Sequence, residues 1–255
     1  MATWEGDSLR REVFFFDSGP HRLYGSLYAS ARRTHPGGVV LCSSWGIEAD
    51  RTQDIVHGLA AEAADLGGAA VVFHYPGYGD SGGRIEDVTI EDLVAAAVRA
   101  AAEGSRREPG TSWVLAGLML GASVAALAWQ RVAARGLLLV QPALDPGAYF
   151  EQLLHRVERA GLVEGKNTDT AFGYPVPEAI RSAGPDVAAA VGAELVACAG
   201  PGAVVRYAEP KPDEALPEGF DAITAPGSWR FGSMRYPDLA RAAVTGLHSV
   251  LRGIG

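Results

Sequence analysis

The stretch Gly117–Gly121 has the residue pattern closest to a catalytic motif. It follows the apolar run 113–116 and opens the alanine-rich run 122–133. A strand, a five-residue turn with a glycine at each end and a helix together form the context of a nucleophile elbow, written G-x-S-x-G. Met119 takes the central position, and a thioether has no proton to lose, so it cannot attack an acyl carbon as an alkoxide would. The sequence predicts the geometry of an elbow without its usual nucleophile, with Met119 as an apolar floor to a binding pocket.

Backbone donors do not depend on the side chain at the elbow. The N–H of Leu120 and an N–H near Ser44 or Trp45 are expected to point at one spot and to form an oxyanion hole. The start of the following helix adds a positive partial charge there. The hydroxyls of Ser43 and Ser44 could donate to a substrate oxygen, or they could only shape the loop.

Three residues are candidate general bases. His74 ends an apolar strand and could take a proton near neutral pH, although it could equally be a structural histidine bonded to the next loop. Glu48 could act as a base, or it could form a local ion pair with Arg51 or a helix cap. His155 lies four residues after Glu151 on one helical face, so that Glu151 could orient it, or the two could form a solvated surface pair.

Further candidates would bind substrate around these groups. Gln141 stands at the carboxyl end of a strand, where it could bond substrate or anchor the following segment. Ser123 is expected to be a packed small residue rather than a replacement nucleophile, because it lies one helical turn beyond the corner. Cys42 lies inside a buried strand and is expected to be an inert thiol. The remaining candidates for substrate contact are Tyr149, Tyr174 and Trp229.

Apolar runs alternate with helical patterns along the chain, which predicts an α/β fold. Strands are expected at 39–42, 69–73, 113–116, 136–140, 203–207 and 220–224, those at 39–42, 69–73 and 136–140 as buried strands. The helices are expected at 52–66, 89–103, 122–133, 148–160 and 237–252. Such alternation predicts a mostly parallel, twisted sheet covered on both faces, with ligands at the carboxyl ends of its strands. Residues 12–28 alternate about a turn and predict an antiparallel hairpin at the sheet edge.

Between 145 and about 190 the pattern changes. One amphipathic helix is followed by a polar loop and the proline-rich segment 174–177, with no buried strand. An insertion at this place is expected to form a small helical lid over the site. We therefore predict one domain spanning residues 1–255, with a lid at about 145–190.

Composition limits the partners. The chain has 255 residues, a formal net charge of −8 and no basic cluster, which argues against binding nucleic acid or an anionic membrane surface. No apolar run approaches the roughly 18 residues that span a bilayer, and the polar N-terminus lacks the apolar core of a signal peptide. The two cysteines show no metal-binding spacing, and no phosphate or dinucleotide motif occurs. We expect a cytoplasmic monomer or homodimer without metal or cofactor, acting on a small molecule, free or derived from a carrier protein.

Several landmarks in the order of the chain resemble the α/β-hydrolase superfamily, in particular its serine-aminopeptidase-like branch. They are the segments 23–25, 43–48, 73–82 and 117–121. The resemblance implies the α/β-hydrolase fold and a catalytic histidine after the last strand, often within H-x-x-F. The corresponding stretch here is Ser228–Phe231, so a serine stands where the histidine is expected. The family acid would follow the preceding strand, where Glu209 and Asp213 are available.

The elbow of this chain is similar to that of a divergent subgroup that reads G-L-x-L-G-A and lacks the serine. Such proteins occur beside exosortase systems and in natural-product clusters. Only two of the 22 basic residues are lysines, which is typical of a GC-rich bacterial genome. The resemblance implies an enzyme of bacterial specialised metabolism with neither the nucleophile nor the base of the triad.

These observations predict chemistry that needs a base and an oxyanion site but no nucleophile. Proton transfer or elimination of a carboxylate, a lyase reaction, from an ester- or carbonyl-containing small molecule fits this requirement. Two alternatives stay open. The protein could be an esterase or thioesterase in which His74 or His155 activates water directly, or it could be a catalytically inactive binding or scaffold protein.

Overall fold

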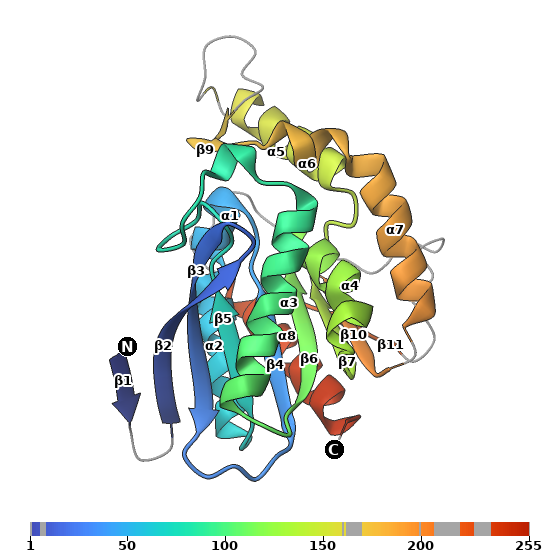
Figure 1. The fold of residues 1–255 in the computed structure, drawn as a ribbon. Coiled ribbons are helices and arrows are strands. Elements are labelled where there is room, and N and C mark those ends of the chain that lie inside the picture. The colour runs from blue at the N-terminus through green and yellow to red at the C-terminus, as the bar shows by residue number, and fades with distance from the viewer. Residues whose placement is uncertain are drawn as a thin grey trace.

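The computed structural model describes residues 2–5, 9–159, 161, 170–198, 200–206, 220–226 and 236–254, and only the backbone of 2–5. Within these residues nine strands form one sheet in the order β1-β2-β3-β5-β4-β6-β7-β10-β11 (Figure 1). They are β1 (Ala2–Glu5), β2 (Leu9–Ser18), β3 (His21–Ser30), β4 (Gly37–Cys42), β5 (Ala69–Phe73), β6 (Ser112–Leu118), β7 (Gly136–Val140), β10 (Gly202–Arg206) and β11 (Phe220–Thr224).

The central strands run parallel because they are buried on both faces. All residues of β4, β5 and β7 are buried, as is typical of parallel strands that helices cover on both sides. The pairs β4–β5, β4–β6, β6–β7, β7–β10 and β10–β11 are parallel. β2 and β3 form the predicted hairpin, with Leu9 opposite Ser30 and Ser18 opposite His21. The prediction of a mostly parallel sheet with an antiparallel hairpin at one end is confirmed.

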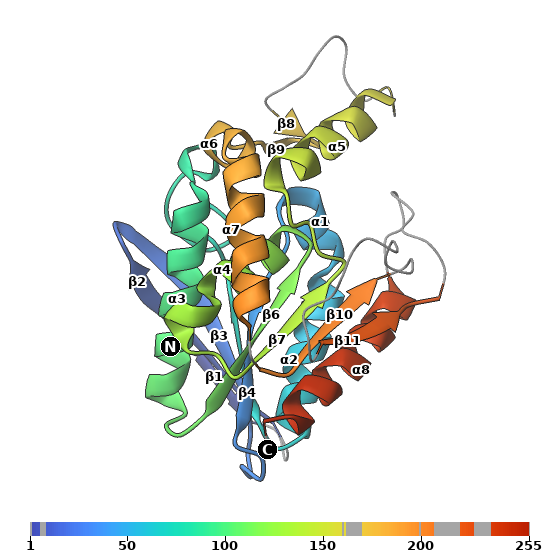
Figure 2. The same cartoon turned by 90° about the vertical axis from the view of Figure 1, so that its right-hand side faces the viewer.

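Helices cover both faces of the sheet (Figure 2). α3 (Ile90–Arg107) and α4 (Leu120–Val132) pack their apolar side chains on one face. α2 (Gln53–Asp65) and α8 (Pro237–Arg252) pack on the other. A capping box begins α3: the Asp92 N–H donates to Thr89 Oγ1 at 3.2 Å and the Thr89 N–H donates to Asp92 Oδ2 at 2.9 Å.

The segment that follows β7 lies over the edge where the parallel strands end (Figure 1). It contains α5 (Pro146–Arg159), the short strands β8 (Thr170–Ala171) and β9 (Tyr174–Pro175), α6 (Glu178–Ser182) and α7 (Gly184–Ala197). Its place above the sheet is the one expected for a lid, and its action as a lid stays a prediction. In the described ranges, no helix combines the length and the apolar character needed to cross a membrane.

Some elements were not expected from the sequence. α1 (Gly46–Arg51) follows β4 after a short loop and is too short to show a helical period. α7 has alanine and valine around most of its circumference, so its apolar residues do not mark one face. β1 is an edge strand of four residues that pairs with β2, and it is too short to show an alternating pattern.

Candidate functional site

The elbow geometry is present at Met119. This residue joins β6 to α4 with φ 51° and ψ −115°, a positive φ that side chains other than glycine rarely adopt. Its N–H donates to the carbonyl of Val140 at 2.9 Å, and its own carbonyl accepts from the N–H groups of Ala122 and Ala143 at 3.0 and 3.1 Å. Bonds from β7, from α4 and from the segment after β7 therefore hold the strained corner.

The two glycines of the turn are required by close backbone contacts. A Cβ on Gly117 would lie 2.2 Å from the carbonyl oxygen of Gly121. A Cβ on Gly121 would lie 2.2 Å from the carbonyl oxygen of Cys42 and 2.3 Å from that of Ser43. The start of α4 thus packs directly against the end of β4. Leu120 is the first residue of α4, so its N–H has no acceptor within the helix.

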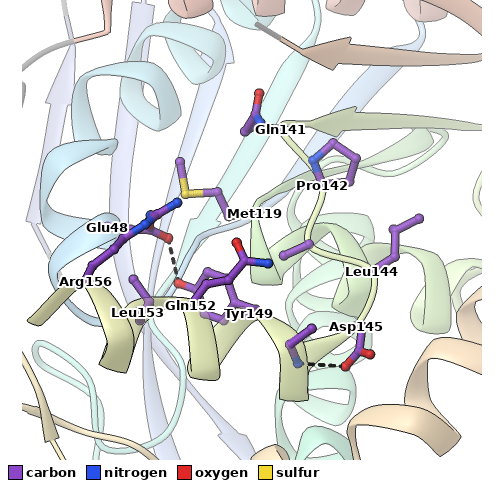
Figure 3. Close-up of a pocket in the computed structure, with 12 residues that line it drawn as sticks. Glu48, Met119, Gln141, Pro142, Leu144, Asp145, Tyr149, Gln152, Leu153 and Arg156 are labelled. Carbon is purple, nitrogen blue, oxygen red and sulfur yellow. Dashed lines mark hydrogen bonds and ion pairs between the residues drawn. The ribbon is translucent and has the colours of Figure 1, made fainter. Parts of the chain in front are cut away.

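A cavity of about 250 Å³ lies beside Met119 (Figure 3). Its walls come from α1, from the corner, from the residues after β7 and from one face of α5. The lining residues are Glu48, Met119, Gln141, Pro142, Ala143, Leu144, Asp145, Ala148, Tyr149, Gln152, Leu153 and Arg156. Four of the residues predicted from the sequence therefore come together here: Glu48, Met119, Gln141 and Tyr149.

Glu48 is the buried acid of this cavity. Glu48 is only 3% exposed, and the Tyr149 hydroxyl donates to its Oε2 at 2.7 Å (Figure 3). A guanidinium nitrogen of Arg156 lies 3.7 Å from Glu48 Oε1. Burial raises the pKa of Glu48, against the opposing effects of the Tyr149 hydrogen bond and of the Arg156 and Arg51 charges. Burial and the neighbouring carboxylate raise the pKa of Tyr149 well above its ordinary value, so this phenol is a neutral donor.

The loop after β4 lies behind Met119. The hydroxyl of Ser44 is within hydrogen-bonding distance of the Met119 sulfur, at 3.4 Å, and Ser44 is buried. The indole N–H of Trp45 donates to the carbonyl of Pro175 at 3.2 Å, which ties this loop to β9. Ser43 and Ser44 line a second cavity rather than the one beside Met119.

Gln141 has a positive φ of 47° directly after β7. Its N–H donates to the carbonyl of Val205 at 2.7 Å, which fixes this backbone turn against β10. Gln141 lines the Met119 cavity at the end nearest Pro142 (Figure 3). The end of β7 therefore places Gln141 at the cavity, and its contact with substrate stays a prediction.

Tyr174 is placed differently from the residues of the cavity. Its hydroxyl bonds to the carboxylate of Asp50, which also accepts a hydrogen bond from Tyr78 at 2.5 Å. The rings of Tyr78 and Tyr174 stack at 6.3 Å between centroids. Tyr174 connects β9 to α1 and to the loop after β5, and it does not belong to the residues that line the Met119 cavity.

The two histidines predicted as bases lie outside the Met119 cavity. His74 stacks on Tyr24 at 4.6 Å between ring centroids, and its Nδ1 accepts from the N–H of Asp80 at 3.3 Å. His155 is exposed on α5, where its Nδ1 lies 3.8 Å from Oε2 of Glu158. Glu151 could have oriented His155 or formed a surface pair with it. Its Oε1 instead lies 3.6 Å from a guanidinium nitrogen of Arg181, because α6 packs beside α5.

All six histidines of the chain fall within the described residues, at positions 21, 35, 57, 74, 155 and 248. None of them lines the Met119 cavity. His248 bonds to Glu62 at 2.6 Å on the far side of the sheet. The predicted contact residue Trp229, the stretch Ser228–Phe231 and the acid candidates Glu209 and Asp213 lie outside the described residues.

Two other nucleophile candidates are packed. Ser123 is fully buried in α4, and its hydroxyl donates to the carbonyl of Ala143 at 2.6 Å. Cys42 is fully buried, and burial raises the pKa of its thiol to about 12. Both findings match the structural roles expected from the sequence. Among the described residues, no group of three or more histidine, cysteine, aspartate or glutamate side chains could hold a metal ion.

Sequence reasoning missed Arg156 and Gln152. Both lie on the face of α5 that carries Tyr149 and Leu153, at the spacing i, i+3, i+4 and i+7 of one helical stripe. This spacing was readable from the sequence once Tyr149 had been singled out. The signal that was missing was the direction of the stripe, which only the packing of α5 over the strand ends decides.

Solved structures similar to this one match it over most of its length. An α/β serine hydrolase without a lid from Xanthomonas campestris matches with a TM-score of 0.60 and 16% identity, over 93% of this chain and 94% of that one. Est1E from Butyrivibrio proteoclasticus, solved with ferulic acid bound, matches with a TM-score of 0.67 and 15% identity, over 94% and 99%. The chain has the α/β-hydrolase fold. A proline iminopeptidase from Mycobacterium smegmatis matches with a TM-score of 0.63 and 14% identity, over 96% and 100%.

These likenesses concern the fold, which hosts many different chemistries. No protein-family model matches the sequence, and no curated protein matches it significantly. The fold therefore does not assign a reaction, and the evidence for function lies in the residues of the cavity.

Proposed function

We propose that this protein is an enzyme that uses the α/β-hydrolase fold without an acyl-serine intermediate. It would move a proton on an ester- or carbonyl-containing small molecule of bacterial specialised metabolism. The observation that carries this proposal is the buried Glu48–Tyr149 pair in the cavity at the elbow residue Met119. A thioether cannot form an acyl-enzyme, whereas a carboxylate with a raised pKa is a stronger base than an exposed one.

The positions of the histidines support a mechanism without a triad. A serine hydrolase needs an imidazole in hydrogen-bonding reach of its nucleophile. No histidine of this chain lines the cavity at Met119, and the sequence outside the described residues contains none. Loss of the nucleophile and loss of the base agree with each other, because either loss alone would remove most of the triad's catalysis.

The proposed first step is enolisation. A carboxylate oxygen of Glu48 takes a proton from the carbon next to the substrate carbonyl. The electron pair of that C–H bond becomes the C=C bond of an enolate, and the negative charge moves to the carbonyl oxygen. The N–H of Leu120 and the positive end of α4 would hold this oxygen. Since the charge passes from Glu48 to the substrate within the cavity that Arg156 lines, the net charge of the cavity does not change.

The proposed second step is elimination. The enolate re-forms its carbonyl, its electron pair makes a C=C bond to the next carbon, and the C–O bond on that carbon breaks. The leaving carboxylate departs with the electron pair of the broken bond. Glu48 then returns its proton to solvent. The cavity of about 250 Å³ sets the size of the substrate to that of a small molecule.

The cavity also bears on the two alternatives. Direct activation of water would make the protein an esterase, the activity named for one similar structure, from Pyrococcus furiosus. Such a reaction would have to use Glu48, because His74 and His155 lie outside the cavity. An inactive binding protein would not need a buried acid with a raised pKa beside the corner, and such acids are commonest at functional sites.

The test uses 4-acetoxybutan-2-one in D₂O, followed by NMR. We expect deuterium to enter the carbon next to the ketone and acetate to be released with the enone. The Glu48→Gln variant should lose roughly 100-fold or more of both rates. Glu151→Gln is the matched control, because Glu151 is an exposed acid of α5 outside the cavity.

The products separate the alternatives. Release of 4-hydroxybutan-2-one without deuterium exchange would replace the lyase proposal with water-activated hydrolysis. Covalent labelling of a serine by a fluorophosphonate would overturn the proposal, because it would reveal an activated hydroxyl. Equal rates with the wild type and with Glu48→Gln would remove Glu48 from the mechanism.

A further inference from the structure

A second cavity of about 240 Å³ lies next to the first. Ser44 separates the two, because it lines the second cavity while its hydroxyl contacts the sulfur of Met119, which lines the first. The residues that line the second cavity are Arg11, Tyr24, Ser43, Ser44, Ala49, Gln53, Val56, His57, Val72, Phe73, His74, Tyr75, Tyr78 and Asp80. The proposed chemistry at Met119 does not use this cavity.

Three basic side chains from three different elements line this second cavity. Arg11 comes from β2, His57 from α2 and His74 from the end of β5. Burial lowers the pKa of His57, and the charge of Arg11 lowers it further. Burial also lowers the pKa of His74, with a further lowering by His57. His57 is therefore close enough to Arg11 and to His74 to be repelled by each of them when both partners are charged.

The opposing negative charge is small. Asp80 lines the cavity and acts on His74, and Asp54 of α2 acts on His57, each raising the pKa of its histidine. Asp80 is the one carboxylate among the lining residues that the structure describes. The other polar lining groups are phenols, hydroxyls and one amide, contributed by Tyr24, Tyr75, Tyr78, Ser43, Ser44 and Gln53. The Tyr28 hydroxyl bonds to His57, and the Asp50 carboxylate accepts from the hydroxyl of Tyr78.

Hydrogen bonds fix one nitrogen of each imidazole. Nδ1 of His74 accepts from the N–H of Asp80 at 3.3 Å, so the neutral ring carries its proton on Nε2. Nδ1 of His57 bonds to the hydroxyl of Tyr28 at 2.9 Å. When Tyr28 donates in that bond, Nε2 of His57 also carries a proton. Both rings therefore offer an N–H donor in addition to the guanidinium of Arg11.

We propose that this second cavity is a binding site for a small oxyanion, a carboxylate or a tetrahedral phosphate-like group, held between Arg11, His57 and His74. Charge-assisted hydrogen bonds from a guanidinium and two imidazoles are the usual means of recognising such groups. A cation is not favoured, because Arg11 offsets the charge of Asp80, the one lining carboxylate that the structure describes. The volume leaves room for a small organic body attached to the anionic group.

Binding of an anion should be linked to proton uptake. An anion between the rings stabilises the imidazolium forms, so it raises the pKa of both histidines and binds more tightly as the pH falls. Sulfate is a suitable tetrahedral probe, since its charge does not change between pH 5 and 8, and acetate is the planar probe. Sodium chloride at equal ionic strength is the control for screening.

The experiment follows the imidazole signals by NMR during pH titrations with each salt. His57→Gln and His74→Gln assign the two signals. We expect the pKa of His57 and of His74 to rise with sulfate, with acetate or with both, relative to chloride. His155 and His248, which lie elsewhere, should respond equally to all salts. Whichever probe acts identifies the geometry of the natural anion, and equal curves in all three salts would overturn the proposal.

A pair of neighbouring arginines provides the matched variants. Arg11→Gln should weaken anion binding about tenfold, as expected for one charge-assisted hydrogen bond, and Arg11→Lys should keep more of it. Arg10→Gln should leave binding unchanged, because Arg10 pairs with Glu12 and Glu108 outside the cavity. Unchanged affinity in a folded Arg11→Gln protein would refute the role of Arg11. None of these outcomes depends on activity at Glu48, so this site and the proposed function stand or fall separately.

Discussion

Removal of the Tyr149 hydroxyl should change the proton affinity of Glu48. The phenol donates to Glu48 Oε2 at 2.7 Å in a buried site, and this bond lowers the pKa of the acid against the effect of burial. A hydrogen bond to a charged group contributes roughly 1.5–3 kcal/mol. Its loss in Tyr149→Phe should therefore favour the protonated form of Glu48 by roughly 10- to 100-fold. Entry of a water molecule into the vacated space would give the lower value.

The rate of proton abstraction shows the effect directly, because only the ionised carboxylate is a base. The acid limb of the pH–rate profile for deuterium exchange should move to higher pH in Tyr149→Phe. The rate at high pH, where Glu48 is ionised in both proteins, should change less. Tyr174→Phe is the control, since that phenol bonds to Asp50 outside the cavity, and its acid limb should not move.

Protein stability gives a second measurement that needs no substrate. The pKa of Glu48 is raised in the folded protein, so its contribution to stability is greatest below the unfolded pKa and is lost as the pH rises through the folded pKa. Tyr149→Phe should therefore lower the free energy of unfolding more at pH 8 than at pH 4. An acid limb that stays in place or moves to lower pH, together with an equal loss of stability at both pH values, would refute this assignment of Glu48 and Tyr149.

The elbow supports two further predictions. Gly121→Ala should destabilise the protein by about 1–3 kcal/mol or more in chemical denaturation, because its Cβ would lie 2.2 Å from the carbonyl oxygen of Cys42. Gly58→Ala, where a Cβ meets nothing within 4 Å in α2, should instead stabilise by about 0.5–1 kcal/mol, and similar effects of the two variants would contradict the packing argument. Met119→Ser should stay folded and gain no hydrolysis of p-nitrophenyl esters, because no histidine lines its cavity. A burst of p-nitrophenol from that variant would show that a base is in reach.

The local elements of the fold were readable because each has its own periodic or capping signal. The continuous apolar runs of β4, β5 and β7 predicted parallel strands buried on both faces. The spacing of Thr89 and Asp92 is that of a capping box, which marks the start of α3. α1 gave no such signal, because a helix of six residues cannot repeat an apolar pattern. Its absence from the prediction left the direction of Glu48 undecided.

The candidate site could be predicted only in part, because local sequence signals do not give the direction of a side chain. Glu48, Met119, Gln141 and Tyr149 follow strand ends or lie on the segment above them, so the topology of the fold brings them together. His74 also ends a strand, but its ring stacks on Tyr24 and lines the second cavity. Two residues at the carboxyl edge of one sheet can thus belong to different cavities. Which cavity each joins depends on the side to which its loop turns.

The sequence by itself determined the alternation of the central strands and their covering helices, the glycine-framed corner and the thioether at its centre, because these depend on neighbouring residues. Only the tertiary structure decided that Glu48 is buried and that Tyr149 and Arg156 of α5 lie beside it. It also decided that Arg11, His57 and His74 line a second cavity. The proton affinity of a carboxylate depends on its solvent and on charges a few ångströms away. Those neighbours are about 100 residues distant in the chain, and only the packing of α5 over the sheet brings them within reach.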